Sequence, residues 1–206
     1  VEEMRYYAMN YSGLSGYIIH DVNYGEFSHK AGCDPINDRS MLAAALLHDK
    51  GTSKGRHANT YTWHNVVNAL EEFGYFDGVE TCEFIPYWRT DGLYEYGLGV
   101  SDAADEFAAE DDLDRMELLS NVYCTIYKNH KTNKAMLIVA NYNGEDVEEE
   151  LRIPPKLLGK PVRKLTDVEV GQEIPFRLSP RSRQPVPHTF VPIHVPKYQF
   201  RMLVVE

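Results

Sequence analysis

The chain has 206 residues, of which 43% are hydrophobic and 25% are charged, and these proportions are typical of a folded globular protein rather than of a disordered or membrane-embedded one. Its 31 acidic residues outnumber its 21 basic ones, and the net charge of −10 argues against a nucleic-acid partner bound through its phosphates. No apolar run approaches the roughly 18 residues that a membrane-spanning helix needs, so we expect no membrane insertion.

The first residues and the cysteines bear on the origin of the chain. Val1 is not an initiator methionine and no signal-peptide pattern follows it, so we expect a piece of a longer protein. Asn10 begins an Asn-Tyr-Ser glycosylation sequon, which favours a secreted or extracellular location. Cys33, Cys82 and Cys124 contain no Cys-x-x-Cys spacing and predict no zinc site; one disulfide with a free thiol, or three thiols, are both open.

Charge and proline content divide the chain into three segments. Residues 1–101 carry a net charge of −7, residues 102–121 also carry −7, residues 122–206 carry +4, and nine of the eleven prolines follow residue 121. The middle segment predicts an acidic linker with a short amphipathic helix. Calcium binding at Asp111–Asp114 is the alternative, but this stretch lacks the glycine that a tight calcium-binding loop needs.

In chain order, residues 1–101 first predict a short buried strand at 16–19, because a glycine is followed there by aromatic and β-branched residues. The next element is a helix over 39–48. Asp38 is its expected cap, and Lys50-Gly51 is its expected end, with the glycine in the left-handed conformation.

The rest of this segment continues the alternation of helix and strand. Residues 52–61 predict a polar loop, and the apolar stripe over 63–73 predicts a second helix that Gly74 ends. A further strand is predicted at 83–87. Strands alternating with helices indicate a β/α layered arrangement.

Residues 122–206 read as β structure throughout. Strands at 122–127 and 135–140 form a predicted hairpin with a five-residue link. The acidic triplet in 147–153 predicts an edge or solvent-facing strand. Four more strands are expected, at 162–166, 173–178, 189–195 and 200–205. Short strands at this spacing predict an antiparallel β-sandwich.

Polar residues directly after the first predicted strand are the first candidate site. His20, Asp21, Asn23 and Tyr24 occupy this position, and in β/α barrels the residues past the carboxyl ends of strands line the active face. They are candidate substrate-binding residues. The alternative is that they simply begin a loop, as Asp and Asn often do.

The second candidate follows the predicted strand at 83–87 and comprises Tyr87, Trp88, Arg89 and Asp91. Aromatic faces stack on sugar rings while polar side chains bind their hydroxyls, so this combination suits carbohydrate. The alternative, which we favour for Tyr87 and Trp88, is an aromatic plug at the joint between two domains.

The sequence identifies no catalytic machinery. It contains no phosphate-binding loop, dinucleotide fingerprint, Gly-x-Ser-x-Gly elbow or His-Glu-x-x-His motif, so we predict neither cofactor nor metal. Glycosidic cleavage usually needs two facing carboxylates. Asp21, Glu26 and Asp91 are acids in suggestive places, but no facing pair can be assigned, and the catalytic residues stay unknown.

The order of these pieces resembles the C-terminal portion of bacterial glycoside hydrolase-like proteins of family 123 and their relatives. The resemblance covers about residues 60–153, and it rests on four stretches: the helix 63–73 ending in Glu-Phe-Gly, the strand 83–88 ending in Tyr-Trp, the hairpin 122–140, and the Asn-Tyr that follows this hairpin.

The resemblance implies an α/β plus all-β fold, with a partial (β/α)8-barrel-like segment at 1–101 and an antiparallel β-sandwich at 122–206. A full barrel takes about 250 residues, so the remaining strands would belong to an upstream segment or another subunit. In that family the adjacent Asp-Glu pair lies on an earlier strand, so no catalytic residue transfers to this chain. The implied function is the C-terminal part of a glycoside hydrolase-like protein that acts on or binds carbohydrate, without activity of its own; a noncatalytic carbohydrate-binding or structural module of an extracellular assembly is the alternative.

Overall fold

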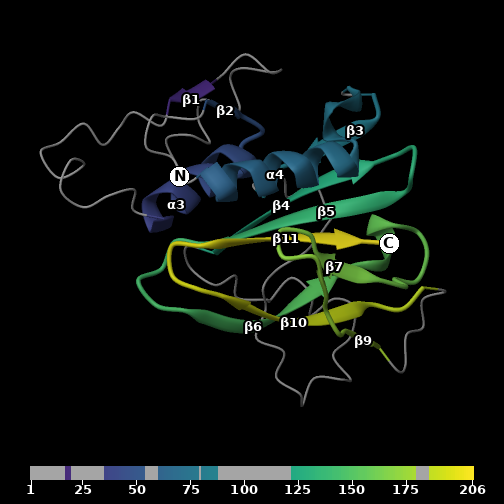
Figure 1. The fold of residues 1–206 in the computed structure, drawn as a ribbon. Helices are drawn as coiled ribbons and strands as arrows, with labels where there is room; N and C mark the ends of the chain where they lie inside the picture. The colour runs from purple at the N-terminus through teal and green to yellow at the C-terminus, as the bar shows by residue number, and fades with distance from the viewer. Residues whose placement is uncertain (1–16, 20–34, 54–59, 79, 88–121, 180–185) are drawn as a thin grey trace, which may run out of the picture.

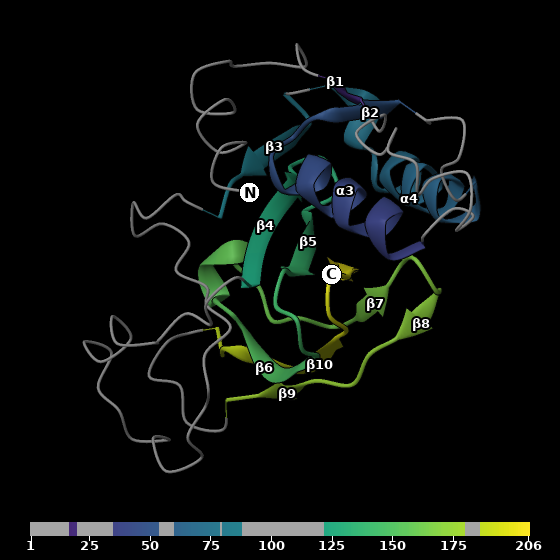
Figure 2. The same ribbon diagram turned by 90° about the vertical axis from the view of Figure 1, so that its left-hand side faces the viewer.

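The computed structural model describes residues 17–19, 35–53, 60–78, 80–87, 122–179 and 186–206. Most of these residues form three layers, in which two helices lie on a six-stranded sheet and a three-stranded sheet packs against its other face (Figures 1 and 2). Residues 17–19 and 51–53 form a separate two-stranded sheet. The six-stranded and three-stranded sheets are both antiparallel. The antiparallel β architecture predicted for residues 122–206 is therefore confirmed.

The six-stranded sheet has the order β3-β4-β5-β11-β7-β8. Its strands are β3 (Cys82–Ile85), β4 (Val122–Asn129), β5 (Lys134–Asn141), β7 (Leu165–Asp167), β8 (Gln172–Glu173) and β11 (Phe200–Val205). β4 and β5 form the predicted hairpin, and the left-handed residue of its turn is Asn133, at φ 50°. The last strand in sequence, β11, lies near the centre of the sheet, between β5 and β7.

The three-stranded sheet has the order β6-β10-β9. Its strands are β6 (Val147–Ile153), β10 (Thr189–Val195) and β9 (Arg177–Leu178). The acidic β6 lies at the edge of this sheet, as expected. The single strand predicted at 173–178 is wrong, because β8 and β9 are separate and belong to different sheets; Pro175 between them has no N–H with which to continue a ladder.

The six-stranded sheet is buried on both faces, which explains why its central strands are continuous apolar runs. Along β5, Ala135, Leu137 and Val139 face the second sheet, while Met136 and Ile138 belong to the cluster under the helices. The three-stranded sheet, with one face toward the core, shows the alternating burial of a half-exposed strand instead.

The helices are α3 (Pro35–Leu47) and α4 (Thr60–Phe73). α4 ends at Gly74, whose φ is 85°, as its sequence predicts. The predicted end of α3 is wrong: the left-handed residue is Asp49, at φ 54°, and not Gly51. Lys50 N–H donates to Ala45 O at 3.0 Å, closing a Schellman-type turn before Gly51 is reached.

α3 connects two parallel strands, β1 (Tyr17–Ile19) and β2 (Gly51–Ser53), in a βαβ unit. The loop predicted at 52–61 is thus wrong for its first two residues, which belong to β2. Their parallel pairing with β1 places them in a strand despite their polar side chains. β3 is antiparallel to β4 and shares its sheet. Two parallel strands do not define a barrel, and the predicted linker at 102–121 lies outside the described residues. No helix in the described ranges is both long and apolar enough to cross a membrane.

Candidate functional site

Of the eight predicted substrate-binding residues, the structure describes one, Tyr87. The other seven lie outside the described residues: His20, Asp21, Asn23, Tyr24, Trp88, Arg89 and Asp91. The predicted glycosylation site Asn10 and Cys33 also lie outside them. The described part of the candidate site therefore consists of Tyr87 and the residues that it contacts, and a second polar cluster lies elsewhere on α3.

Tyr87 follows β3 and lies between the six-stranded sheet and α3. Its backbone N–H donates to Thr125 Oγ1 at 3.3 Å, and its ring centroid lies 4.7 Å from that of Tyr123. Tyr123 is in turn 6.0 Å from Tyr142, so the ends of three neighbouring segments contribute one row of tyrosines. Tyr142 Oη donates to Ser40 O on α3 at 2.8 Å. The tyrosine row, Tyr87, Tyr123 and Tyr142, thus fastens α3 to the sheet.

His48, at the end of α3, contacts this row from the helix side. It is buried, and its Nδ1 lies 2.7 Å from Ala44 O, so Nδ1 is a protonated nitrogen that donates to this carbonyl. Its Nε2 is 3.4 Å from Tyr87 Oη, and the two rings meet edge to face at 5.6 Å. The described contacts of Tyr87 are those of an aromatic residue packed between the helix and the sheet.

The chemistry open to the tyrosine row is limited. Burial raises the pKa of Tyr142 far above its ordinary value, so this phenol stays protonated at any physiological pH and acts as a hydrogen-bond donor. The row can position a helix and offer aromatic surface.

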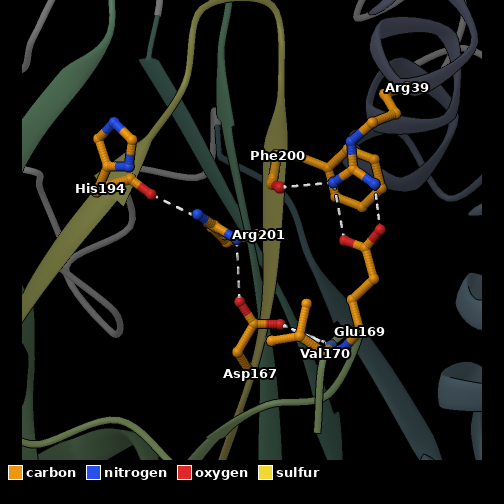
Figure 3. Close-up of polar contacts among 7 residues, drawn as sticks. All are labelled: Arg39, Asp167, Glu169, Val170, His194, Phe200 and Arg201. Atoms are coloured by element: carbon orange, nitrogen blue, oxygen red, sulfur yellow. Dashed lines mark hydrogen bonds and ion pairs between the residues drawn. The ribbon is translucent and has the colours of Figure 1, made fainter. Parts of the chain in front are cut away.

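A second polar cluster joins α3 to the turn between β7 and β8 (Figure 3). Arg39 makes a two-pronged ion pair with Glu169, one N–H donating to Oε2 at 2.8 Å and the other to Oε1. Arg39 also donates to Phe200 O at 3.1 Å and stacks 4.5 Å above the centre of the Phe200 ring. The exposed fractions of the two charged side chains are only 17% and 9%.

Asp167 holds the turn that presents Glu169. Its Oδ1 accepts the backbone N–H groups of Glu169 and Val170 at 3.2 and 3.4 Å, while Arg201 lies 3.5 Å from its Oδ2. Arg201 also donates to His194 O at 3.0 Å. Burial raises the pKa of Asp167, partly offset by Arg201 and by these N–H bonds.

Two carboxylates therefore lie in one turn, but the arrangement is not that of a glycosidase. A catalytic pair needs one acid and one base facing the substrate. Asp167 is buried and engaged by Arg201, and Glu169 is almost buried and engaged by both prongs of Arg39. This cluster, which we call the Arg39 clamp, fixes α3 on the sandwich.

Cysteine and metal chemistry find no support in the described residues. Cys82 and Cys124 are buried thiols, and burial is the first cause that raises the pKa of each to about 12. Within the described ranges, no group of three or more His, Cys, Asp or Glu side chains could hold a metal ion.

Sequence reasoning missed His48, Arg39 and Glu169. His48 carries no motif, and Arg39 lies 130 residues from Glu169, so no local spacing links the two. Glu169 lies beyond the strand predicted at 162–166, and no motif marks it. A scan of protein-family models finds no match to the chain, and a search of curated proteins finds none.

Proposed function

We propose that this chain is the C-terminal part of a glycoside hydrolase-like protein that acts on or binds carbohydrate, and that its described part supports the site rather than performing catalysis. One observation carries the proposal: the six-stranded sheet is covered on its second face by α3 and α4, and α3 is also the crossover helix of a parallel βαβ unit. The sandwich therefore serves as a base to which a β/α segment is fixed.

The order of elements supports a barrel-like origin for the β/α segment. β1, α3, β2 and α4 follow one another as the last two units of a (β/α)8 barrel would. Parallel sheets are normally covered on both faces and contain more than two strands, so further β/α units, from an upstream segment or another subunit, would complete the sheet that β1 and β2 begin.

The position of the candidate substrate residues fits this arrangement. β1 ends at Ile19, so His20 and Asp21 directly follow the carboxyl end of a strand in a parallel pair. Ligands of β/α proteins bind outside the carboxyl ends of their strands. The Arg39 clamp and the tyrosine row hold α3, the next described element after this strand end, on the sandwich.

The test compares carbohydrate binding and turnover by the 206-residue chain and its variants. Asp21→Asn and Trp88→Ala should each weaken retention on carbohydrate affinity gels, with the melting temperature almost unchanged in Asp21→Asn. Phe76→Ser is the control, because Phe76 is an exposed aromatic residue (60% exposed) on the short helix after α4.

Two results would contradict the proposal. If Asp21→Asn lowers the melting temperature strongly and leaves retention unchanged, the residue belongs to the fold rather than to the site. If the 206-residue chain alone hydrolyses nitrophenyl N-acetylhexosaminides, and Asp21→Asn abolishes this, then the module is catalytic and the supporting role is wrong.

A noncatalytic carbohydrate-binding or structural module of an extracellular assembly is the second candidate. The pairing of both carboxylates in the Arg39 clamp favours it, because these acids serve structure. An extracellular location is part of this proposal and rests on the Asn10 sequon. Native material in which Asn10 is unmodified would remove its support.

A further inference from the structure

Two turns meet at one end of the sandwich, the β5–β6 turn and the β10–β11 turn (Figure 1). Buried Asn141 ties them together, because its Nδ2 donates to Glu145 O at 2.9 Å and to Val195 O at 3.0 Å. Its backbone N–H donates to Gln199 O at 2.9 Å. The two turns therefore form one braced surface.

Asp146 also connects the two turns, and its carboxylate is a polar group on this surface. Its Oδ1 accepts the backbone N–H of Lys197 at 2.9 Å, and its Oδ2 lies 3.3 Å from His194 Nε2. The bond from Lys197 is the main reason that the pKa of Asp146 is lowered, so the group is a carboxylate at neutral pH. The side chains of His194 and Asp146 are about half exposed, at 45% and 53%.

Tyr198 stands on the same surface in a conformation that its side chain disfavours. Its φ is 56°, in the left-handed region that glycine adopts freely and that costs free energy for a bulky residue. Tyr198 is 41% exposed, and its hydroxyl lies 3.5 Å from the point that a Cβ on Gly144 would occupy. A glycine would satisfy this turn better, so a partly exposed tyrosine at such a position points to a use for the ring.

We propose that Tyr198, His194, Asp146 and Lys197 form a second carbohydrate-contact site, carried by the sandwich itself, that takes a neutral sugar unit. The exposed ring offers a stacking surface, while the carboxylate, the imidazole and the ammonium group bind hydroxyls. The opposite charges of Asp146 and Lys197 favour a neutral ligand over a polyanion. The choice of carbohydrate rests on the proposed function; the surface itself rests on the geometry of the two turns.

Affinity gel electrophoresis of the 206-residue chain tests this site, with xylan, galactomannan or hydroxyethyl cellulose in the gel and heparin as an anionic comparison. We expect at least one neutral polysaccharide to retard the chain. Tyr198→Gly should weaken this binding about fivefold or more, since a stacking contact is lost, whereas Tyr198→Phe and the control Phe76→Ser should retain it. The melting temperature of Tyr198→Gly should equal or exceed that of the wild type, because glycine adopts the turn without strain.

The outcomes separate this site from the strand-end site. Unchanged binding in Tyr198→Gly, or retardation by heparin alone or by no polysaccharide, overturns the proposal. If Trp88→Ala weakens binding and Tyr198→Gly does not, only the turn site is wrong. If Tyr198→Gly weakens binding and Trp88→Ala does not, the turn site stands and the strand-end site is wrong.

Discussion

The Arg39 clamp should contribute measurably to stability, and a double-mutant cycle of Arg39→Ala and Glu169→Gln tests this. Breaking a buried ion pair costs about 3–5 kcal/mol, and breaking an exposed one about 0–1 kcal/mol. Because Arg39 and Glu169 are 17% and 9% exposed, we place Glu169→Gln between these limits, at about 2 kcal/mol. For a chain of this size that loss lowers the melting temperature by about 4–8 °C.

Arg39→Ala should cost more than Glu169→Gln, about 3 kcal/mol, because it also removes the stacking over Phe200 and the bond to Phe200 O. Urea unfolding at pH 7 and low salt gives the free energies, and the cycle should show a coupling of at least about 1 kcal/mol between Arg39 and Glu169. Hydrogen exchange should also accelerate in α3 of both single variants, because the clamp fixes this helix.

The chain contains a matched control in the pair Arg177–Glu150. It is also two-pronged, with distances of 2.9 and 2.7 Å, but its side chains are 48% and 22% exposed. Its coupling should be only about 0.5 kcal/mol. If the Arg39–Glu169 coupling is no larger than that of Arg177–Glu150, then burial does not strengthen the clamp and the reasoning fails.

Three further predictions concern buried groups and a strained turn. Burial raises the pKa of Asp167, so the native state binds the proton of this carboxyl more tightly than the unfolded state does, and the stability from this group is greatest below pH 3.8 and is lost as pH rises through the native pKa. The difference in unfolding free energy between the wild type and Asp167→Asn, measured with urea, should therefore shrink with rising pH. A difference that grows with rising pH would contradict the raised pKa. Gly74→Ala should lower the free energy of unfolding by about 2 kcal/mol or more, because φ is 85° and the new Cβ would lie 2.8 Å from a side-chain amide nitrogen. The control Gly171→Ala, at φ 68° with open space around it, should lower it by only about 1 kcal/mol. Equal losses would show that the close contact does not matter. Cys82 and Cys124 should resist iodoacetamide at pH 8 until the protein unfolds, because both are buried and their pKa values are about 12; rapid native labelling of either, located by mass spectrometry, would contradict their burial.

Local patterns predicted the elements that their own neighbours determine. The apolar stripe of 63–73 and the glycine after it locate α4 within three residues at its start and at the same residue at its end. The apolar runs of β5 and β11 were recognisable as strands, since burial on both faces leaves no polar positions. By contrast, the end of α3 was missed because an aspartate, Asp49, takes the left-handed position that glycine was expected to occupy.

Long-range pairing lay beyond the sequence pattern. Nothing local indicates that β3 joins β4, or that Glu169 reaches Arg39 from 130 residues away. The candidate site shows the same limit. The contact of Tyr87 with His48 depends on how α3 lies on the sheet, and no periodicity in the chain contains that information.

The position of β11 has a consequence for synthesis on the ribosome. β11 is the last strand of the described chain to be made, yet it pairs with both β5 and β7. Until it leaves the exit tunnel, β5 lacks its partner on this edge, and β7 lacks the strand through which it joins the sheet. The helices made earlier then lack Phe200, Met202 and Val204, part of the surface on which they finally pack. Nascent chains should therefore remain prone to association through the β5 edge, and dependent on chaperones, until the final strand inserts.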